Sequence, residues 1–146
     1  MGPIEIIEEK GAISYLNFGR TSTCASKITP LLKEAKAQLD SYFNHQPAQF
    51  NLPLTPAATV FQEKMRAYML AIPPGETRSY GEAANFLTSA PRSTGQACKR
   101  NPIPIIVPCH RIIAADGRLG GYSGSGGRQT KRFLLTLENG RGTWSS

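Results

Sequence analysis

The sequence is poor in the residues from which disulfide frameworks and metal clusters are built. Its 146 residues include three cysteines, an odd number, and two histidines. Cys24, Cys98 and Cys109 are widely spaced and form no CxxC pair, and His45 and His110 are the remaining soft ligands. This pattern argues against a disulfide scaffold and against a cysteine-rich zinc site. We therefore expect reduced thiols, of which one is reactive, and neither a metal nor a cofactor.

Long apolar segments are also missing. No run of hydrophobic residues approaches the length of a transmembrane helix. The N-terminal sequence MGPIEIIEEK lacks the basic start and apolar core of a secretory signal, and Ile6 stands where a myristoylated protein needs Ser or Thr. We expect a monomeric, cytoplasmic protein that makes no contact with a membrane.

Positive charge is concentrated in the second part of the chain. The net charge is +7, yet residues 1–54 hold five Lys or Arg and five Asp or Glu. Residues 55–146 hold twelve basic and five acidic residues. A basic part of this kind is typical of a face that binds a polyanion, although a solvated basic surface explains the charge equally well.

The first part of the chain predicts a small α/β unit. Residues 4–8 and 12–18 are apolar stretches on either side of a Lys-Gly turn, which indicates a β-hairpin. A helix is expected from Pro30, with Thr29 as its N-cap, to about residue 43. Residues 44–56 contain three prolines and few charges, which is typical of a linker. We therefore place a domain boundary between residues 1–54 and 55–146.

The second part predicts a mainly helical domain, so the expected fold class is α+β. A helix follows Thr59 and ends before the Pro-Pro-Gly sequence at residues 73–75. Ser79 and Glu82 form a capping box for a short helix that ends near residue 87, and Pro91 begins another that ends near residue 100. Two short helices across a tight turn are typical of a helix-turn-helix, but such pairs are also common without that function.

Residues 101–113, NPIPIIVPCHRII, combine an apolar composition with three prolines. Proline removes backbone donors and favours extended neighbours, so we expect a buried, stiff, extended segment that presents Cys109. Residues 116–127 contain six glycines and form either a flexible loop or one that approaches a ligand closely. An amphipathic helix with Phe133, Leu134 and Leu137 on its apolar face is expected over residues 129–138.

The neighbouring Cys109 and His110 suggest nucleophilic chemistry. A thiolate is the strongest soft nucleophile in proteins, but an ordinary thiol is mostly protonated at neutral pH and needs a base. His110 can supply that base, and a carboxylate on its other nitrogen would fix the tautomer. Because neighbours in an extended chain point to opposite faces, we expect a bridging water between the two side chains.

The proline-rich segment around PCHR resembles the active-site signature of the O6-alkylguanine-DNA alkyltransferases, also called methylated-DNA–protein-cysteine methyltransferases. Five other segments are similar to the same family: IPPGETRSYGE, LGGYSG, LLTLE and, in the first part, QLDSYF and FNLPL. The likeness covers nearly the whole chain. It implies repair of double-stranded DNA by stoichiometric, irreversible transfer of an alkyl group from O6-alkylguanine, or from O4-alkylthymine, after base flipping.

The resemblance also implies roles for individual residues. Cys109 matches the acceptor, His110 the residue that deprotonates it through a water, and Glu138 the carboxylate that orients the histidine. Asn101 matches an asparagine that ties the helix-turn-helix to the active-site segment. Tyr80 matches a tyrosine that crowds the phosphate of the target nucleotide. The residues expected to contact the substrate are Tyr80, Tyr122, Ser123 and Ile112, and those expected to contact DNA are Arg92, Gly95, Lys99 and Arg100.

Arg92 matches the arginine finger that fills the gap left by the flipped base, and Gly95 would let its helix lie against a narrow groove. Arg111 and Arg118 are also expected to contact phosphates. The stretch from Tyr80 to Arg92 is shorter than is usual in the family, and the loop around residues 125–127 is longer. The first part of the chain is short and has no counterpart of the metal ligands that some relatives carry.

Three other functions compete with alkyl transfer. A non-catalytic alkylguanine sensor would bind damaged DNA, but such relatives lack the acceptor cysteine. A helix-turn-helix regulator would use Cys109 only for packing, which leaves the proline-rich segment and the glycine loop without a role. A cysteine hydrolase fits poorly with the basic helix pair.

Overall fold

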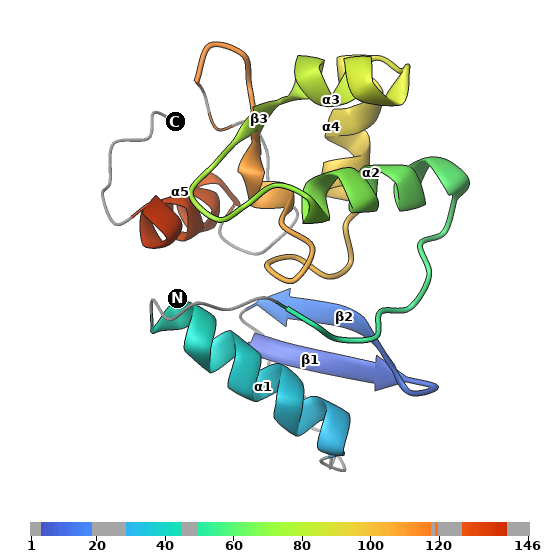
Figure 1. Ribbon diagram of the computed structural model, residues 1–146, viewed down its shortest axis with the longest axis vertical. Helices are drawn as coiled ribbons and strands as arrows, with labels where there is room; N and C mark the ends of the chain where they lie inside the picture. The colour runs from blue at the N-terminus through green and yellow to red at the C-terminus, as the bar shows by residue number, and fades with distance from the viewer. Residues whose placement is uncertain (1–3, 19–28, 45–49, 118, 120–126, 140–146) are drawn as a thin grey trace. The chain divides into compact units, whose positions relative to one another are not determined.

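The computed structural model describes residues 4–18, 29–44, 50–117, 119 and 127–139 (Figure 1). The chain divides into two compact units, Met1–Thr55 and Pro56–Ser146, and each is described by itself. The first unit combines a β-hairpin with a helix, and the second is mainly helical. The expected α+β class with a helical C-terminal domain is confirmed.

The N-terminal unit is built on an antiparallel pair of strands, β1 (Ile4–Glu9) and β2 (Ala12–Phe18). The turn between them places Lys10 and Gly11 at φ values of 52° and 77°, the left-handed region that two-residue hairpin turns require. Helix α1 (Pro30–Phe43) starts as predicted, because the Thr29 side chain accepts a hydrogen bond from the backbone of Leu32. The buried side chains of this unit include Ile13, Leu16, Ala35, Leu39 and Tyr42.

The end of the predicted linker is part of this unit. Leu54 forms a parallel β-bridge with Ile13. The Ile13 backbone donates to Pro53 at 2.8 Å and accepts from Thr55 at 2.9 Å. The interpretation of residues 44–56 as a mere connection was therefore wrong for its last residues, since they satisfy backbone groups at the edge of β2.

The C-terminal unit contains helices α2 (Val60–Leu70), α3 (Tyr80–Leu87), α4 (Pro91–Lys99) and α5 (Gly127–Asn139). Two very short strands, β3 (Arg78–Ser79) and β4 (Ile112–Ile113), pair in parallel. This pairing sets the start of α3 beside the active-site segment, although about thirty residues separate them in the chain. The short sheet therefore explains how Tyr80, the first residue of α3, reaches the site.

Helices α3 and α4 form the predicted pair across a tight turn. The Ser79 side chain accepts from the Glu82 backbone at 3.0 Å, and Glu82 accepts from the Ser79 backbone at 3.1 Å, which confirms the capping box. Pro91 occupies the first turn of α4, as expected. The fully buried Thr94 donates to the carbonyls of Pro91 and Tyr80, at 2.7 and 3.3 Å, and so joins the two helices.

The segment from Asn101 to Ile113 is buried, as predicted, but it is not extended. Ile105 has a φ of 72°, and residues Cys109–Arg111 form one turn of 3-10 helix, η1. The backbone of Val107 donates to Ile103 at 2.9 Å, so the chain turns back on itself. Prolines leave too few donors for a strand, and tight turns satisfy the remaining polar groups within the buried segment.

The buried face of α5 differs from the predicted one. Lys131, Leu134 and Leu135 are almost completely buried, whereas Phe133 is 39 % exposed. Together with Glu138, the buried residues follow the i, i+3, i+4, i+7 spacing of one helix face. The predicted face was wrong because Lys131 was not counted among the residues of the buried stripe. Among the described helices, none is long and apolar enough to cross a membrane.

Candidate active site

Asn101 anchors the segment that carries the candidate nucleophile. This residue follows α4 directly, and its side chain is buried. Its Nδ2 donates to the carbonyl of Val107 at 2.9 Å, while its Oδ1 accepts from the backbone of Ile103 at 3.0 Å. The two bonds hold the turn before Cys109 and connect it to α4, which is the arrangement that the sequence led us to expect for this asparagine.

Cys109 and His110 occupy the single turn of 3-10 helix, η1. Cys109 is 2 % exposed, and His110 is fully buried. The expectation that they lie on opposite sides of an extended chain was wrong, because the backbone curls at this point. A buried thiol next to a buried imidazole is shielded from solvent.

Glu138 connects the histidine to Arg111. The His110 Nε2 and Glu138 Oε2 atoms are 2.6 Å apart. The guanidinium of Arg111 donates to both carboxylate oxygens, from Nε at 3.0 Å and from Nη2 at 2.8 Å, and its Nη1 donates to the carbonyl of Ile72 at 2.7 Å. Arg111 is 7 % exposed, so the expectation that it contacts DNA phosphates was wrong. Its forked geometry instead fixes the carboxylate that faces His110.

The electrostatics of this cluster keep the imidazole neutral and the carboxylate charged. Burial lowers the pKa of His110, and the positive charges of Arg111 and Lys131 add to that effect against the opposing pull of Glu138. Burial alone would raise the pKa of Glu138, but the hydrogen bond with His110 and the hydrogen bonds and charge of Arg111 lower it well below its usual range. The Nδ1 atom of His110 is buried and has no hydrogen-bond partner among the described residues. A neutral imidazole with one open nitrogen is suited to accept a proton.

Lys131 is a functional candidate that the sequence reasoning missed. It is fully buried on α5, and its Nζ donates to the carbonyl of Ile112 at 2.6 Å and to the hydroxyl of Tyr80 at 3.3 Å. The same nitrogen lies 5.5 Å from the centre of the Tyr80 ring. Burial lowers the pKa of Lys131 to about 8, against the opposing charges of Cys109 and Cys98. In the sequence, the spacing of Lys131, Leu134 and Glu138 places the lysine on the same helix face as the other two residues.

Tyr80 meets this lysine from the start of α3. Its pKa is raised well above the usual value by burial, with smaller contributions from the negative charges of Cys98 and Cys109. The hydroxyl therefore keeps its proton at neutral pH. Ile112, expected to contact the substrate, is fully buried and contributes the carbonyl that holds Lys131.

Cys98 is the second buried thiol of this unit. Its Sγ lies 4.0 Å from the sulfur of Met69, in the core between α2 and α4. Burial raises the pKa of Cys98 to about 12, and the charge of Cys109 raises it further against the attraction of Lys131. The Cys98 thiol is therefore a poor nucleophile at neutral pH.

The residues expected to contact DNA lie along α4. Arg92, Lys99 and Arg100 are exposed, Arg92 in the first turn of the helix and the other two at its end. Gly95 is half-buried and faces Tyr80, since a Cβ built on it would lie 4.0 Å from a ring carbon of that tyrosine. Tyr122, Ser123 and Arg118 lie outside the residues that the structure describes, as do Cys24 and His45. Within the described residues, no group of three or more acidic, histidine or cysteine side chains could hold a metal.

Comparison with known proteins places this site in a family. Residues 1–56 match the model described as "6-O-methylguanine DNA methyltransferase, ribonuclease-like domain", and residues 60–140 match its "DNA binding domain". The constitutive methylated-DNA–protein-cysteine methyltransferase of Bacillus subtilis is 47% identical, over 94% of this chain and 90% of the relative. A Methanosarcina acetivorans relative of the same name is 38% identical, over 94% and 92%.

A solved structure agrees with these sequence matches. The crystal structure of Mycobacterium tuberculosis OGT in complex with DNA has a TM-score of 0.83 and 38% sequence identity, covering 96% of this chain and 88% of that one. The matches span both units and include the segment that carries Cys109. The chain therefore belongs to the 6-O-methylguanine DNA methyltransferase family.

Proposed function

We propose that this protein repairs double-stranded DNA by moving the alkyl group of an O6-alkylguanine onto Cys109, once per molecule. Membership of the family makes it a DNA-binding methylated-DNA–protein-cysteine methyltransferase that acts by alkyl transfer to a cysteine. The assignment of Cys109 as the acceptor rests on its position in one buried turn with His110, whose ring is held by Glu138. Neither a sensor nor a regulator needs such a relay.

The thiol proton leaves first. His110 is neutral because burial lowers its pKa, and its Nδ1 is the open nitrogen of the ring. This atom takes the proton from Cys109, directly or through one water, and Glu138 stabilises the imidazolium that forms. Arg111 keeps the carboxylate ionised and in place. The result is a thiolate in a buried site.

Alkyl transfer then exchanges one bond for another. The Cys109 sulfur attacks the alkyl carbon, a C–S bond forms, and the bond from that carbon to O6 breaks with its electron pair going to the guanine. The base needs a proton to leave as neutral guanine. Tyr80 supplies it and recovers a proton from Lys131, whose Nζ donates to the Tyr80 hydroxyl. The thioether product has no leaving group for hydrolysis, so the reaction is irreversible and ends after one turnover.

DNA reaches the site through α4. Extruding a base costs a few kcal/mol, and Arg92 offsets that cost by filling the gap in the stack. Lys99 and Arg100 contact phosphates without reading sequence, which makes binding sensitive to salt. Tyr80 crowds the phosphate of the flipped nucleotide, and Gly95 lets α4 approach the groove. Tyr122, Ser123 and Ile112 line the pocket for the alkylated base.

The same proposal covers the organisation of the chain. Residues 55–146 bind DNA and accept the alkyl group, and residues 1–54 form a separate, short α/β domain. The division into two compact units supports this arrangement. We further propose that the protein works as a monomer in the cytoplasm.

Two serine variants test the assignment of Cys109. Cys109→Ser should bind an O6-methylguanine duplex as tightly as the unchanged protein, measured by fluorescence anisotropy, and accept no methyl group. Cys98→Ser removes the other buried thiol and should still accept one, because the pKa of Cys98 is raised to about 12. Methyl transfer by Cys109→Ser, or its loss in a well-folded Cys98→Ser, would contradict the proposal.

A further inference from the structure

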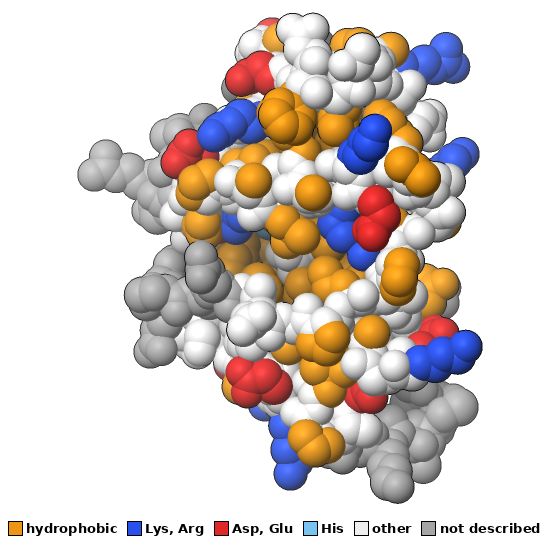
Figure 2. Space-filling model, turned by 45° about the vertical axis from the view of Figure 1, so that its right-hand side comes forward, with side chains coloured by type: hydrophobic (Ala, Val, Ile, Leu, Met, Phe, Trp, Pro, Cys, Tyr) orange, Lys and Arg blue, Asp and Glu red, His pale blue; other side chains and the backbone are white. Residues whose placement is uncertain are grey.

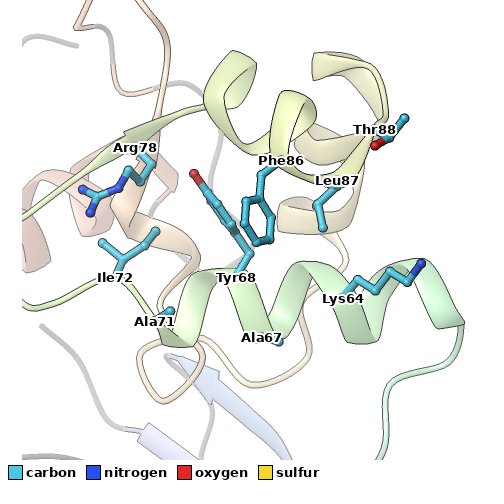
Figure 3. Close-up of a pocket in the computed structure, with 9 residues that line it drawn as sticks. All are labelled: Lys64, Ala67, Tyr68, Ala71, Ile72, Arg78, Phe86, Leu87 and Thr88. Carbon is cyan, nitrogen blue, oxygen red and sulfur yellow. The ribbon is translucent and has the colours of Figure 1, made fainter.

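A pocket between α2 and the end of α3 has no part in the reaction described above. Its volume is about 590 Å³, within the range of about 300–1,000 Å³ that is usual for ligand sites. Small and apolar side chains line most of it, and one basic side chain lies at either end (Figure 3). The lining residues are Lys64, Ala67, Tyr68, Ala71, Ile72, Arg78, Phe86, Leu87 and Thr88.

The pocket follows from the two faces of α2. Met65 and Met69 are buried in the core of the unit, as their spacing predicts. A second stripe, Lys64, Ala67, Tyr68 and Ala71, has the i, i+3, i+4, i+7 spacing of one helix face and lines the pocket. Ala67, Tyr68 and Ala71 make most of this second stripe apolar, and Lys64 places a positive charge at its start. The domain itself covers the first stripe and leaves the second accessible.

Two residues at the end of α3, Phe86 and Thr88, line the pocket in unusual states. Phe86 is 73% exposed, although its ring lies against that of Tyr68 with the centroids 5.1 Å apart. Thr88 ends the helix with a φ of 53°, a conformation that is strained for a β-branched residue and natural for glycine. Figure 2 shows hydrophobic and basic side chains side by side on the surface that it presents. The exposed ring of Phe86 at the edge of an apolar pocket offers a bound partner an aromatic surface.

The charges at the pocket indicate what binds there. Lys64 is exposed and has no ion-pair partner in the part of the chain that the structure describes. Arg78 already binds a carboxylate, because its Nη2 lies 3.2 Å from the Oε1 atom of Glu76. The arginine side chain is still 33% exposed. We propose that the pocket binds an acidic peptide segment of a partner protein, with a bulky apolar side chain against Tyr68 and Phe86 and carboxylates on Lys64 and Arg78.

Other occupants match the pocket less well. A nucleic-acid strand needs a row of cations along its backbone, whereas this pocket has one cation at either end. The negative charge of Glu82 also lies close by, since it raises the pKa of Tyr68, after the larger effect of burial. A second copy of this chain carries a net charge of +7 and would be repelled. Charge and shape together favour the acidic peptide.

The test is a direct binding measurement without DNA, so that its failure leaves the alkyl-transfer proposal unaffected. The probe is a fluorescent synthetic peptide, Gly-Asp-Phe-Leu-Asp-Gly, and its partner probe has Lys in place of both Asp. Phe86→Ser should weaken binding at least tenfold, since it removes an aromatic anchor, and Lys64→Glu several-fold. Two matched controls lie outside the pocket lining: Phe133→Ser changes an aromatic residue of α5 that is 39% exposed, and Lys33→Glu changes an exposed lysine of α1. Both should bind within twofold of the unchanged protein.

Circular dichroism establishes that each variant is folded, and Ala71→Leu, which narrows the pocket, replaces Phe86→Ser if that variant is not. The proposal is overturned if the acidic peptide does not bind at millimolar concentration or if the lysine peptide binds as well. It is equally overturned if both pocket variants match their controls, or if a thymidine oligonucleotide competes for the pocket. Self-association that Phe86→Ser abolishes would assign the pocket to a second copy instead.

Discussion

Glu138→Gln perturbs the centre of the proposed relay while keeping the shape of the side chain. Glu138 accepts two bonds from Arg111 and faces His110 at 2.6 Å, and its side chain is 2% exposed. An amide cannot neutralise the buried guanidinium, so the substitution leaves Arg111 as an uncompensated charge. Breaking a buried pair in this way costs about 3–5 kcal/mol of unfolding free energy. The rate of alkyl transfer should fall about 100-fold or more, because the imidazolium loses its counter-charge.

Urea unfolding measures the first effect, and single-turnover methyl transfer, followed by intact mass, measures the second. Glu34→Gln is the matched control, since Glu34 is exposed on α1 and should change stability by less than about 0.5 kcal/mol. Combining Glu138→Gln with Arg111→Leu removes both charges and should restore part of the stability but none of the rate. Wild-type stability together with a wild-type rate in Glu138→Gln would refute the reasoning.

Three further changes examine other parts of the site. The transfer rate should decline above about pH 8, because the buried Lys131 there loses the proton that it supplies. Lys131→Met should react slowly and show no such decline. If the variant keeps the pH profile of the unchanged protein, Lys131 is not part of the proton path. Arg92→Ala should slow repair of duplex DNA far more than reaction with free O6-benzylguanine, whereas equal losses would count against a finger. Gly95→Ala should stabilise the protein by up to about 1 kcal/mol, since its Cβ meets Tyr80 at an ordinary 4.0 Å, yet weaken DNA binding if α4 lies against a groove.

Local sequence signals predicted most of the helices correctly. Thr29, Ser79 and Pro91 each mark a helix start, and the structure begins α1, α3 and α4 at those points. Such signals succeed because a cap satisfies its donors within a few residues, so nothing distant in the chain is needed. The burial of the proline-rich segment was also predictable, because a segment with so many apolar residues is not expected at the surface.

Contacts between distant residues were less accessible to prediction. The positive φ of Ile105 and the turn before Cys109 go with hydrogen bonds of the Asn101 side chain to Ile103 and Val107. The helix and strand propensities of single residues do not predict such bonds. Arg111 was expected at the surface, but Glu138 and a backbone carbonyl give its charge a buried partner. Lys131 was missed because a lysine on an apolar stripe is usually solvated, and its acceptors come from β4 and α3. Charged residues are buried only where such partners converge, and that convergence is a property of the fold.

The central claim is that Cys109 receives the alkyl group, and peptide mapping after reaction tests it most directly. The intact protein is incubated with excess duplex containing O6-methylguanine, digested and analysed by tandem mass spectrometry. We expect a single methyl group per molecule, on the peptide that contains Cys109, and no further uptake when fresh substrate is added. A methyl group on Cys98 or Cys24, or repeated turnover without any adduct, would contradict it.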